Sequence, residues 1–229
     1  MYEAIGLEKF LRKVLYVNSL LVLVLVTSLL EWLPNTSLFR VVPVSVLLMT
    51  ATVSFLGQTA LFPKACRLPL IWKIFPDIDG SYDVEIASNW SLIQAREEGR
   101  SLQTERDVGN QLFKKNGTLT VTARLFSINI RLEMDDRYST SDTVVCCLKK
   151  DGGGPRPVMS YIYKARVLQP QTSDGGHHFG AARIEIPNQR RIDMLEGIYW
   201  TDRNWHLARN TAGRIVLRRR KNPRKGAQR

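Results

Sequence analysis

The residues best suited to bind a charged ligand lie near the end of the chain, at a spacing of two. Gly197, Tyr199, Thr201 and Arg203 occupy alternate positions. In a β-strand they would share one face, so that a ring, a hydroxyl and a guanidinium stand in a row. Tyrosine can stack on a nucleotide base, while threonine and arginine can bond phosphate oxygens. The residues alone leave open a second interpretation, a solvated strand face whose tyrosine packs against a neighbour.

Three other segments carry comparable side chains. Thr140 and Ser141 belong to a cluster of hydroxyl residues, and Tyr163 belongs to an aromatic pair with Tyr161. Arg131 is a cation on the polar face of an alternating segment. We therefore treat these positions as further candidates for ligand contact, with the same ordinary structural alternative.

No constellation typical of catalysis or of a metal site accompanies them. His177 and His178 sit in a glycine-rich turn, and His206 is isolated from other histidines. Cys146 and Cys147 have no second Cys or His pair at ligand spacing, so we interpret them as packing residues. We expect a binding protein rather than an enzyme, with no metal and no cofactor.

The elements that would position these residues are short strands. Eight runs rich in Val, Ile, Thr and Tyr are separated by turn residues, and several alternate with a period of two. This pattern predicts an all-β domain over 77–221, an eight-stranded up-and-down barrel, with a two-sheet sandwich as the alternative. Such a barrel can hold one small ligand. Only residues 91–113 break the pattern. The expected strands are 80–88, 117–125, 127–135, 142–150, 157–166, 178–187, 191–202 and 213–221.

Two uncharged apolar runs precede this domain. They predict two N-terminal transmembrane α-helices at about 13–33 and 41–63, forming a hairpin over residues 1–63. A cleaved signal peptide and a soluble helical hairpin are the alternatives. A proline-rich connector, 64–76, would lead from the membrane to the barrel.

Charge distribution predicts the orientation and the kind of partner. Basic residues flank the outer ends of both apolar runs, so both termini and the β domain of this two-pass membrane protein are expected in the cytoplasm. The formal net charge is +12, but ten basic residues and no acidic ones fall within 203–229. The tail 222–229 would contact anionic membrane lipids or remain solvated, and we expect no DNA or RNA partner.

The order of these segments resembles a known family. It is similar to the two-transmembrane, β-strand-rich effectors of bacterial CBASS anti-phage defence, which are partnered with CD-NTase enzymes. The resemblance rests on two apolar runs, a proline-rich connector and a series of motifs in fixed order: Gly80-Ser81-Tyr82, Ser88-Asn89-Trp90, Ser139-Thr140-Ser141, Tyr161-Ile162-Tyr163, His178-Phe179-Gly180 and Gly-x-Tyr-x-Thr-x-Arg at 197–203.

This resemblance implies a specific activity. The barrel would bind a cyclic dinucleotide made by the CD-NTase, and binding would drive the transmembrane helices into homo-oligomers that disrupt the inner membrane and kill the infected cell. By motif, the ligand would contact Tyr199, Thr201 and Arg203, with Tyr82, Thr140, Ser141 and Tyr163 as weaker candidates, while Arg131 is added from its chemistry alone. The alternatives are a membrane-tethered barrel that binds a lipid or other apolar ligand, and a small membrane-bound hydrolase.

Overall fold

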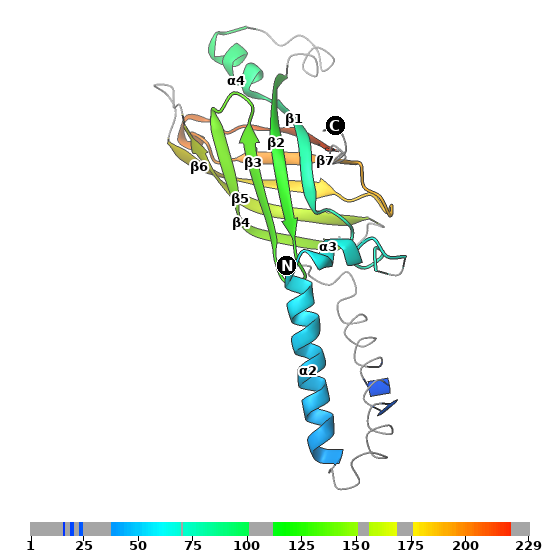
Figure 1. Cartoon of the computed structure of the whole chain (residues 1–229). Coiled ribbons are helices and arrows are strands. Elements are labelled where there is room, and N and C mark those ends of the chain that lie inside the picture. Colours follow the sequence, from blue (N-terminus) through cyan, green and yellow to red (C-terminus); the bar gives the residue numbers. More distant parts are fainter. Residues whose placement is uncertain are drawn as a thin grey trace, which may run out of the picture.

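The fold was analysed in a computed structural model of the 229-residue chain. The structure describes residues 38–69, 71–100, 112–150, 156–168 and 176–220, together with Tyr16, Ser19, Leu20, Leu23 and Val24. Figure 1 shows a β-barrel with a long helix, α2 (Leu38–Gln58), extending from one end. The predicted basic tail, 222–229, lies outside the described residues.

Eight antiparallel strands form the barrel, and each pairs with the next along the chain. The first strand also pairs with the last, so the sheet closes without a free edge. The predicted up-and-down barrel is therefore confirmed, and the sandwich alternative is excluded. The strands are β1 (Gly80–Ser88), β2 (Phe113–Ala123), β3 (Ile128–Met134), β4 (Ser139–Lys150), β5 (Pro157–Val167), β6 (His177–Glu185), β7 (Met194–Thr201) and β8 (Ala212–Arg219).

Alternation along the strands decides which side chains enter the barrel. In β3, Ile128 and Ile130 are buried, whereas Asn129, Arg131 and Glu133 are exposed. β4 contains a register shift between Thr143 and Val145, which is typical of a β-bulge. The bulge changes the phase of the strand, so both the polar start and the apolar end of β4 place alternate side chains inside.

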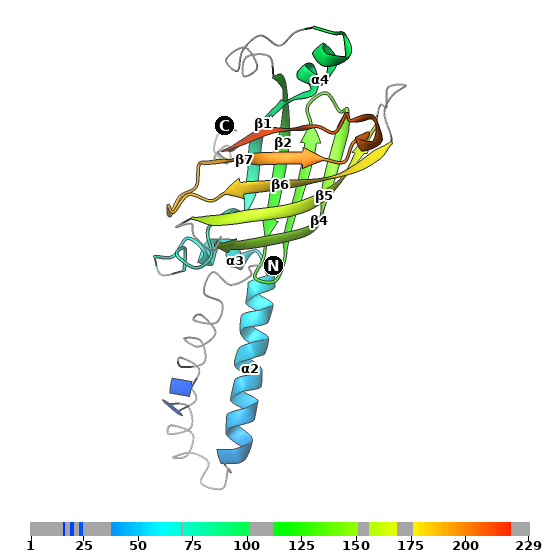
Figure 2. The ribbon, with the colours of Figure 1, turned by 180° about the vertical axis from the view of Figure 1, so that it is seen from behind.

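The two ends of the barrel differ in what covers them. The odd-numbered strands begin at the end from which α2 extends, which we call the helix end, and they finish at the opposite pocket end (Figures 1 and 2). The short helix α4 (Trp90–Glu97) follows β1 and therefore lies at the pocket end.

The interior near the helix end is filled with apolar side chains. The short helix α3 (Leu61–Ala65) places Phe62 against Phe75, with ring centroids 5.5 Å apart. The backbone N–H of Leu125, in the β2–β3 turn, donates to the carbonyl of Gly57 at the end of α2 over 2.9 Å. Fully buried residues of the barrel complete this core: Leu119, Leu148, Met159, Ile184, Leu195 and Leu217.

The helical half of the predicted fold class was wrong. In the described part of the chain, no helix combines the length and the apolar character needed to cross a membrane. The predicted second span, 41–63, is not one continuous helix, because α2 ends at Gln58 and the chain turns at 59–60 before α3. Almost all of the predicted first span, 13–33, lies outside the described residues.

Candidate ligand-binding site

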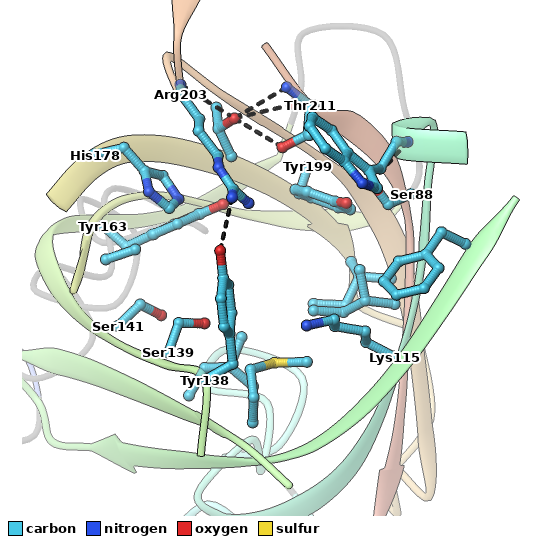
Figure 3. A pocket seen from close by; sticks show the side chains of 18 of the residues that line it. Ser88, Lys115, Tyr138, Ser139, Ser141, Tyr163, His178, Tyr199, Arg203 and Thr211 are labelled. Carbon is cyan, nitrogen blue, oxygen red and sulfur yellow. Dashed lines mark hydrogen bonds between the residues drawn. The ribbon is translucent and has the colours of Figure 1, made fainter. Parts of the chain in front are cut away.

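A cavity of about 340 Å³ opens at the pocket end of the barrel, and all eight strands contribute to its lining (Figure 3). This volume falls in the range usual for small-molecule sites. The lining comprises Ile86, Ser88, Trp90, Phe113, Lys115, Leu132, Met134, Asp136, Tyr138, Ser139, Ser141, Tyr161, Tyr163, Ala165, His178, Tyr199, Thr201, Arg203, Thr211 and Ile215.

Three tyrosines form the aromatic part of the wall. Tyr161 and Tyr163 come from β5, with ring centroids 5.8 Å apart, and Tyr199 comes from β7. Burial raises the pKa of all three phenols, so they remain neutral and present O–H groups and ring faces to a ligand. Gly180 lies beside the Tyr163 ring, and a Cβ at that position would clash with the ring, so the missing side chain makes room for it.

Hydroxyl groups line the cavity beside the tyrosines. The side-chain oxygens of Thr201 and Thr211 are 2.9 Å apart, and the backbone N–H of Thr211 donates to the Thr201 oxygen over 3.2 Å. Both residues are buried, as is Ser141. The Thr201–Thr211 pair therefore fixes the chain at the point where β7 ends, immediately before Arg203.

Arg203 is held over two aromatic rings. Its guanidinium lies 5.5 Å from the ring centroid of Trp90 and 5.7 Å from that of Tyr138, and its Nη2 donates to the Tyr138 hydroxyl over 2.7 Å. Asn89 fixes Trp90 in place, because its N–H donates to the Ala212 carbonyl and its side-chain oxygen accepts from the Ala212 N–H, both over 2.9 Å. The guanidinium is thus oriented before any ligand binds.

A second cation reaches the cavity from the opposite wall. Nζ of Lys115 lies 4.2 Å from the Tyr138 ring centroid and 2.8 Å from a carboxylate oxygen of Asp136. Burial by itself would raise the pKa of Asp136, but hydrogen bonds from Lys115 and from the Tyr138 N–H, together with the Lys115 charge, lower it. Asp136 is therefore ionised at neutral pH and neutralises Lys115.

The structure brings five of the eight predicted site residues together. Tyr199, Thr201, Arg203, Ser141 and Tyr163 all line the cavity.

The other three predicted site residues lie elsewhere. Tyr82 is buried near the helix end, where its hydroxyl donates to the Ile78 carbonyl over 2.8 Å. Thr140 alternates with Ser139 and Ser141, which line the cavity, so it belongs to the outer face. Arg131 is also on the outer face, where it pairs with Glu133 at 2.8 Å.

Several lining residues were missed by the sequence reasoning. Lys115, Tyr138, Trp90 and His178 were not among the candidates, although they supply one of the two cations of the cavity and three of its ring side chains. A signal for Lys115 was present, because it alternates in phase with the buried residues of β2: Gly117, Leu119, Val121 and Ala123.

The fold and the cavity define a small closed barrel with a cavity at one end that cationic and aromatic side chains line. No protein-family model matches the chain. Over 145 residues the chain is 27% identical to a protein from Escherichia albertii named CD-NTase-associated protein 15, and the aligned region covers 63% of each protein. The chain therefore spans less than two thirds of the length of this relative. The similarity supports the resemblance to CBASS-associated proteins that the sequence motifs indicated.

Proposed function

We propose that this protein is an effector of CBASS antiviral defence whose barrel binds a cyclic dinucleotide at the pocket end. The observation that carries the proposal is that Arg203 and Lys115 both contact Tyr138 in a cavity that three further tyrosines also line. The name of the relative, which associates it with a CD-NTase, supports the same class of ligand.

The charges suit such a ligand. A cyclic dinucleotide carries two phosphate charges, and the cavity offers two cations that already lie at its mouth. A hydrogen bond to a charged group contributes about 1.5–3 kcal/mol, roughly twice the value for a neutral pair. Aromatic side chains can stack on bases at about 1–3 kcal/mol per base, and Tyr163 and Tyr199 are available for this contact.

A barrel that carries a lipid or another apolar ligand would need a different lining. Its interior should be apolar throughout, whereas Arg203 and Lys115 face this cavity and would lose hydration without gaining a partner. We therefore prefer an anionic ligand, and we infer that the protein acts by binding it rather than by catalysis or by contact with DNA or RNA.

The output we propose is self-association of the protein followed by disruption of the inner membrane and cell death. On the outer face of the barrel, Val145, Ile162, Ala181 and Trp200 pair directly across β4, β5, β6 and β7. We call this set the outer row; three of its members are 45–53% exposed. An exposed apolar row of this length favours contact with another protein surface.

The surface that we propose for this contact is the same row of a second copy, because in a two-fold symmetric dimer one patch of the surface meets itself. For the membrane contact we assign the exposed apolar side chains of α2, among them Leu47, Leu48 and Phe55.

Calorimetry on the full-length protein tests the ligand. The protein is titrated with a panel of cyclic dinucleotides that differ in their bases, and at least one is expected to bind. Arg203→Ala should abolish binding, whereas Arg131→Ala, which removes an arginine from the outer face, should not change it. The absence of heat for every member of the panel would refute the proposed ligand class.

A further inference from the structure

A second hollow of about 310 Å³ lies just outside the barrel mouth. Residues at the start of β6 and residues that follow β7 line this outer hollow: His177, His178, Phe179, Asp202, Arg203, Asn204, Trp205 and His206. His178 and Arg203, which Figure 3 shows at the barrel cavity, line both spaces, so we place these two side chains at the boundary between them.

The loop that carries the outer hollow is tied to the barrel at both sides. The Phe179 N–H donates to the Asp202 carboxylate over 2.7 Å, and the Asp202 N–H donates to the Phe179 carbonyl over 2.9 Å. Further along the loop, Arg209 pairs with Glu97 of α4 at 2.5 Å. The outer hollow therefore has a fixed position relative to the mouth of the cavity.

Within this loop, a single-turn helix, η1 (Trp205–Leu207), presents an indole to solvent. Trp205 is 71% exposed, although its apolar ring would ordinarily be covered. His206 contacts it edge to face, with ring centroids 6.1 Å apart. The residues that flank η1, Asn204 and Ala208, both have a left-handed backbone, with φ of 47° and 55°. The chain thus adopts a costly conformation that leaves an aromatic surface open.

We infer that the two hollows are compartments of one site, and that the site binds an anionic ligand with a ring system on each side of its phosphates. One ring lies in the barrel against Tyr163 and Tyr199. The phosphates contact Arg203 and His178 at the wall between the compartments, and the second ring stacks on Trp205 outside. This inference rests on the proposed function and assigns the two bases of the cyclic dinucleotide to different environments.

The arrangement predicts different behaviour for ligands with one base and with two. A nucleoside monophosphate can fill the barrel compartment and reach Arg203, but it has no ring left for Trp205. A cyclic dinucleotide occupies both compartments. Loss of the Trp205 indole should therefore weaken binding of the cyclic dinucleotide alone. Loss of Arg203, which lines both hollows, should weaken binding of both ligands.

Calorimetry on the full-length protein tests this inference, with the best-binding cyclic dinucleotide and the nucleoside monophosphate of each of its bases as ligands. Trp205→Ala should weaken the cyclic dinucleotide by roughly 5- to 150-fold, the range expected for one base stack, and leave the monophosphates unchanged. Trp205→Phe should restore most of the loss. Leu207→Ala is the matched control, because Leu207 belongs to the same turn, is exposed, and lines neither hollow.

The outcomes separate the two-compartment site from the proposed function. If the wild-type protein binds the cyclic dinucleotide and Trp205→Ala binds it equally well, the outer compartment is refuted while the proposed function stands. An equal loss for both classes of ligand, or a loss in Leu207→Ala as large as in Trp205→Ala, would also overturn it, because the effect would then come from the loop's structure. If the wild-type protein binds no cyclic dinucleotide, both conclusions fail.

Discussion

Nη2 of Arg203 donates a 2.7 Å hydrogen bond to the hydroxyl of Tyr138, which joins two residues that lie 65 positions apart in the chain. Arg203 follows β7, and Tyr138 belongs to the β3–β4 turn, where Arg137 adopts a left-handed backbone with φ of 53°. Lys115 lies against the same tyrosine ring. Tyr138 is therefore the shared partner of both cations.

The hydrogen bond between Arg203 and Tyr138 predicts that removing the Tyr138 hydroxyl strengthens ligand binding. Tyr138→Phe keeps the ring beside both cations but removes the hydroxyl, so Arg203 need not give up a protein hydrogen bond when it binds phosphate. We expect the affinity for the cyclic dinucleotide to rise by up to about tenfold, the equivalent of one net hydrogen bond. Tyr138→Leu, which also removes the ring, should weaken binding. Calorimetry showing Tyr138→Phe to be as inactive as Arg203→Ala would contradict this role.

Replacing Asp136 is also expected to raise the affinity for the cyclic dinucleotide. Its carboxylate neutralises Lys115 and would repel a phosphate that approaches the same ammonium. Asp136→Asn should therefore increase affinity and steepen its dependence on salt, because one more cation becomes available. Lys115→Met should lower the affinity and make it less dependent on salt. Titrations at several ionic strengths would measure them, and an Asp136→Asn variant with weaker binding than wild type would exclude this competition.

The same ion pair predicts how stability depends on pH. Because the folded pKa of Asp136 lies below its unfolded value of about 4, the carboxylate contributes stability above pH 4 that is lost as the pH falls through the folded value. Urea unfolding should show wild type to be more stable than Asp136→Asn at pH 6, with the difference shrinking below pH 4. A difference that stays constant between pH 6 and pH 3 would disprove the linkage.

The direction of each strand explains which site residues could be predicted from the sequence. In an up-and-down barrel, odd-numbered strands finish and even-numbered strands begin at the pocket end, so inward residues near those positions share the cavity. Tyr199 and Thr201 satisfy this rule at the end of β7. Tyr82 lies near the start of β1 and therefore at the other end of the barrel, beside Ile78.

Other parts of the structure depend on information that local patterns do not contain. β2 begins at Phe113, four residues before the predicted start at 117, and this extension carries Lys115 into the lining. Trp90 reaches the cavity only because the segment after β1 folds back as α4. Apolar composition alone predicted a continuous helix over 41–63 and could not reveal the turn at 59–60.

The outer row predicts a separation between ligand binding and assembly. Ile162→Asp places a charge at the centre of this apolar surface. The Ile162 side chain points outward, so the substitution lies on the face of β5 opposite to the cavity. We expect it to abolish ligand-induced self-association, measured by sedimentation of the full-length protein, while calorimetry shows unchanged affinity. Thr120→Asp is the control, since Thr120 is exposed on β2 outside the row. Normal assembly of Ile162→Asp would eliminate the outer row as the interface.

Among the substitutions proposed, replacement of Arg219 should lower the free energy of unfolding the most. Its side chain is 15% exposed at the helix end, where it pairs with Asp77 and donates to the carbonyls of Ile192 and Asp79 and to the Tyr82 hydroxyl. This arginine connects the last strand to the first strand and to the segment that leads from α3.

Arg219→Met would leave the buried carboxylate of Asp77 with Arg67 as its remaining ion-pair partner among the described residues. Removing one partner of a buried pair costs up to about 3–5 kcal/mol, and Arg67 reduces the part of this cost that comes from Asp77. Arg218→Met, at the neighbouring exposed position, should change the free energy of unfolding by less than about 0.5 kcal/mol. Adding Asp77→Asn to Arg219→Met should recover part of the loss, because the buried carboxylate that Arg219 had helped to neutralise is then removed. Denaturant titrations in which the double variant is no more stable than Arg219→Met would show that the arginine stabilises the barrel through its carbonyl contacts rather than through Asp77.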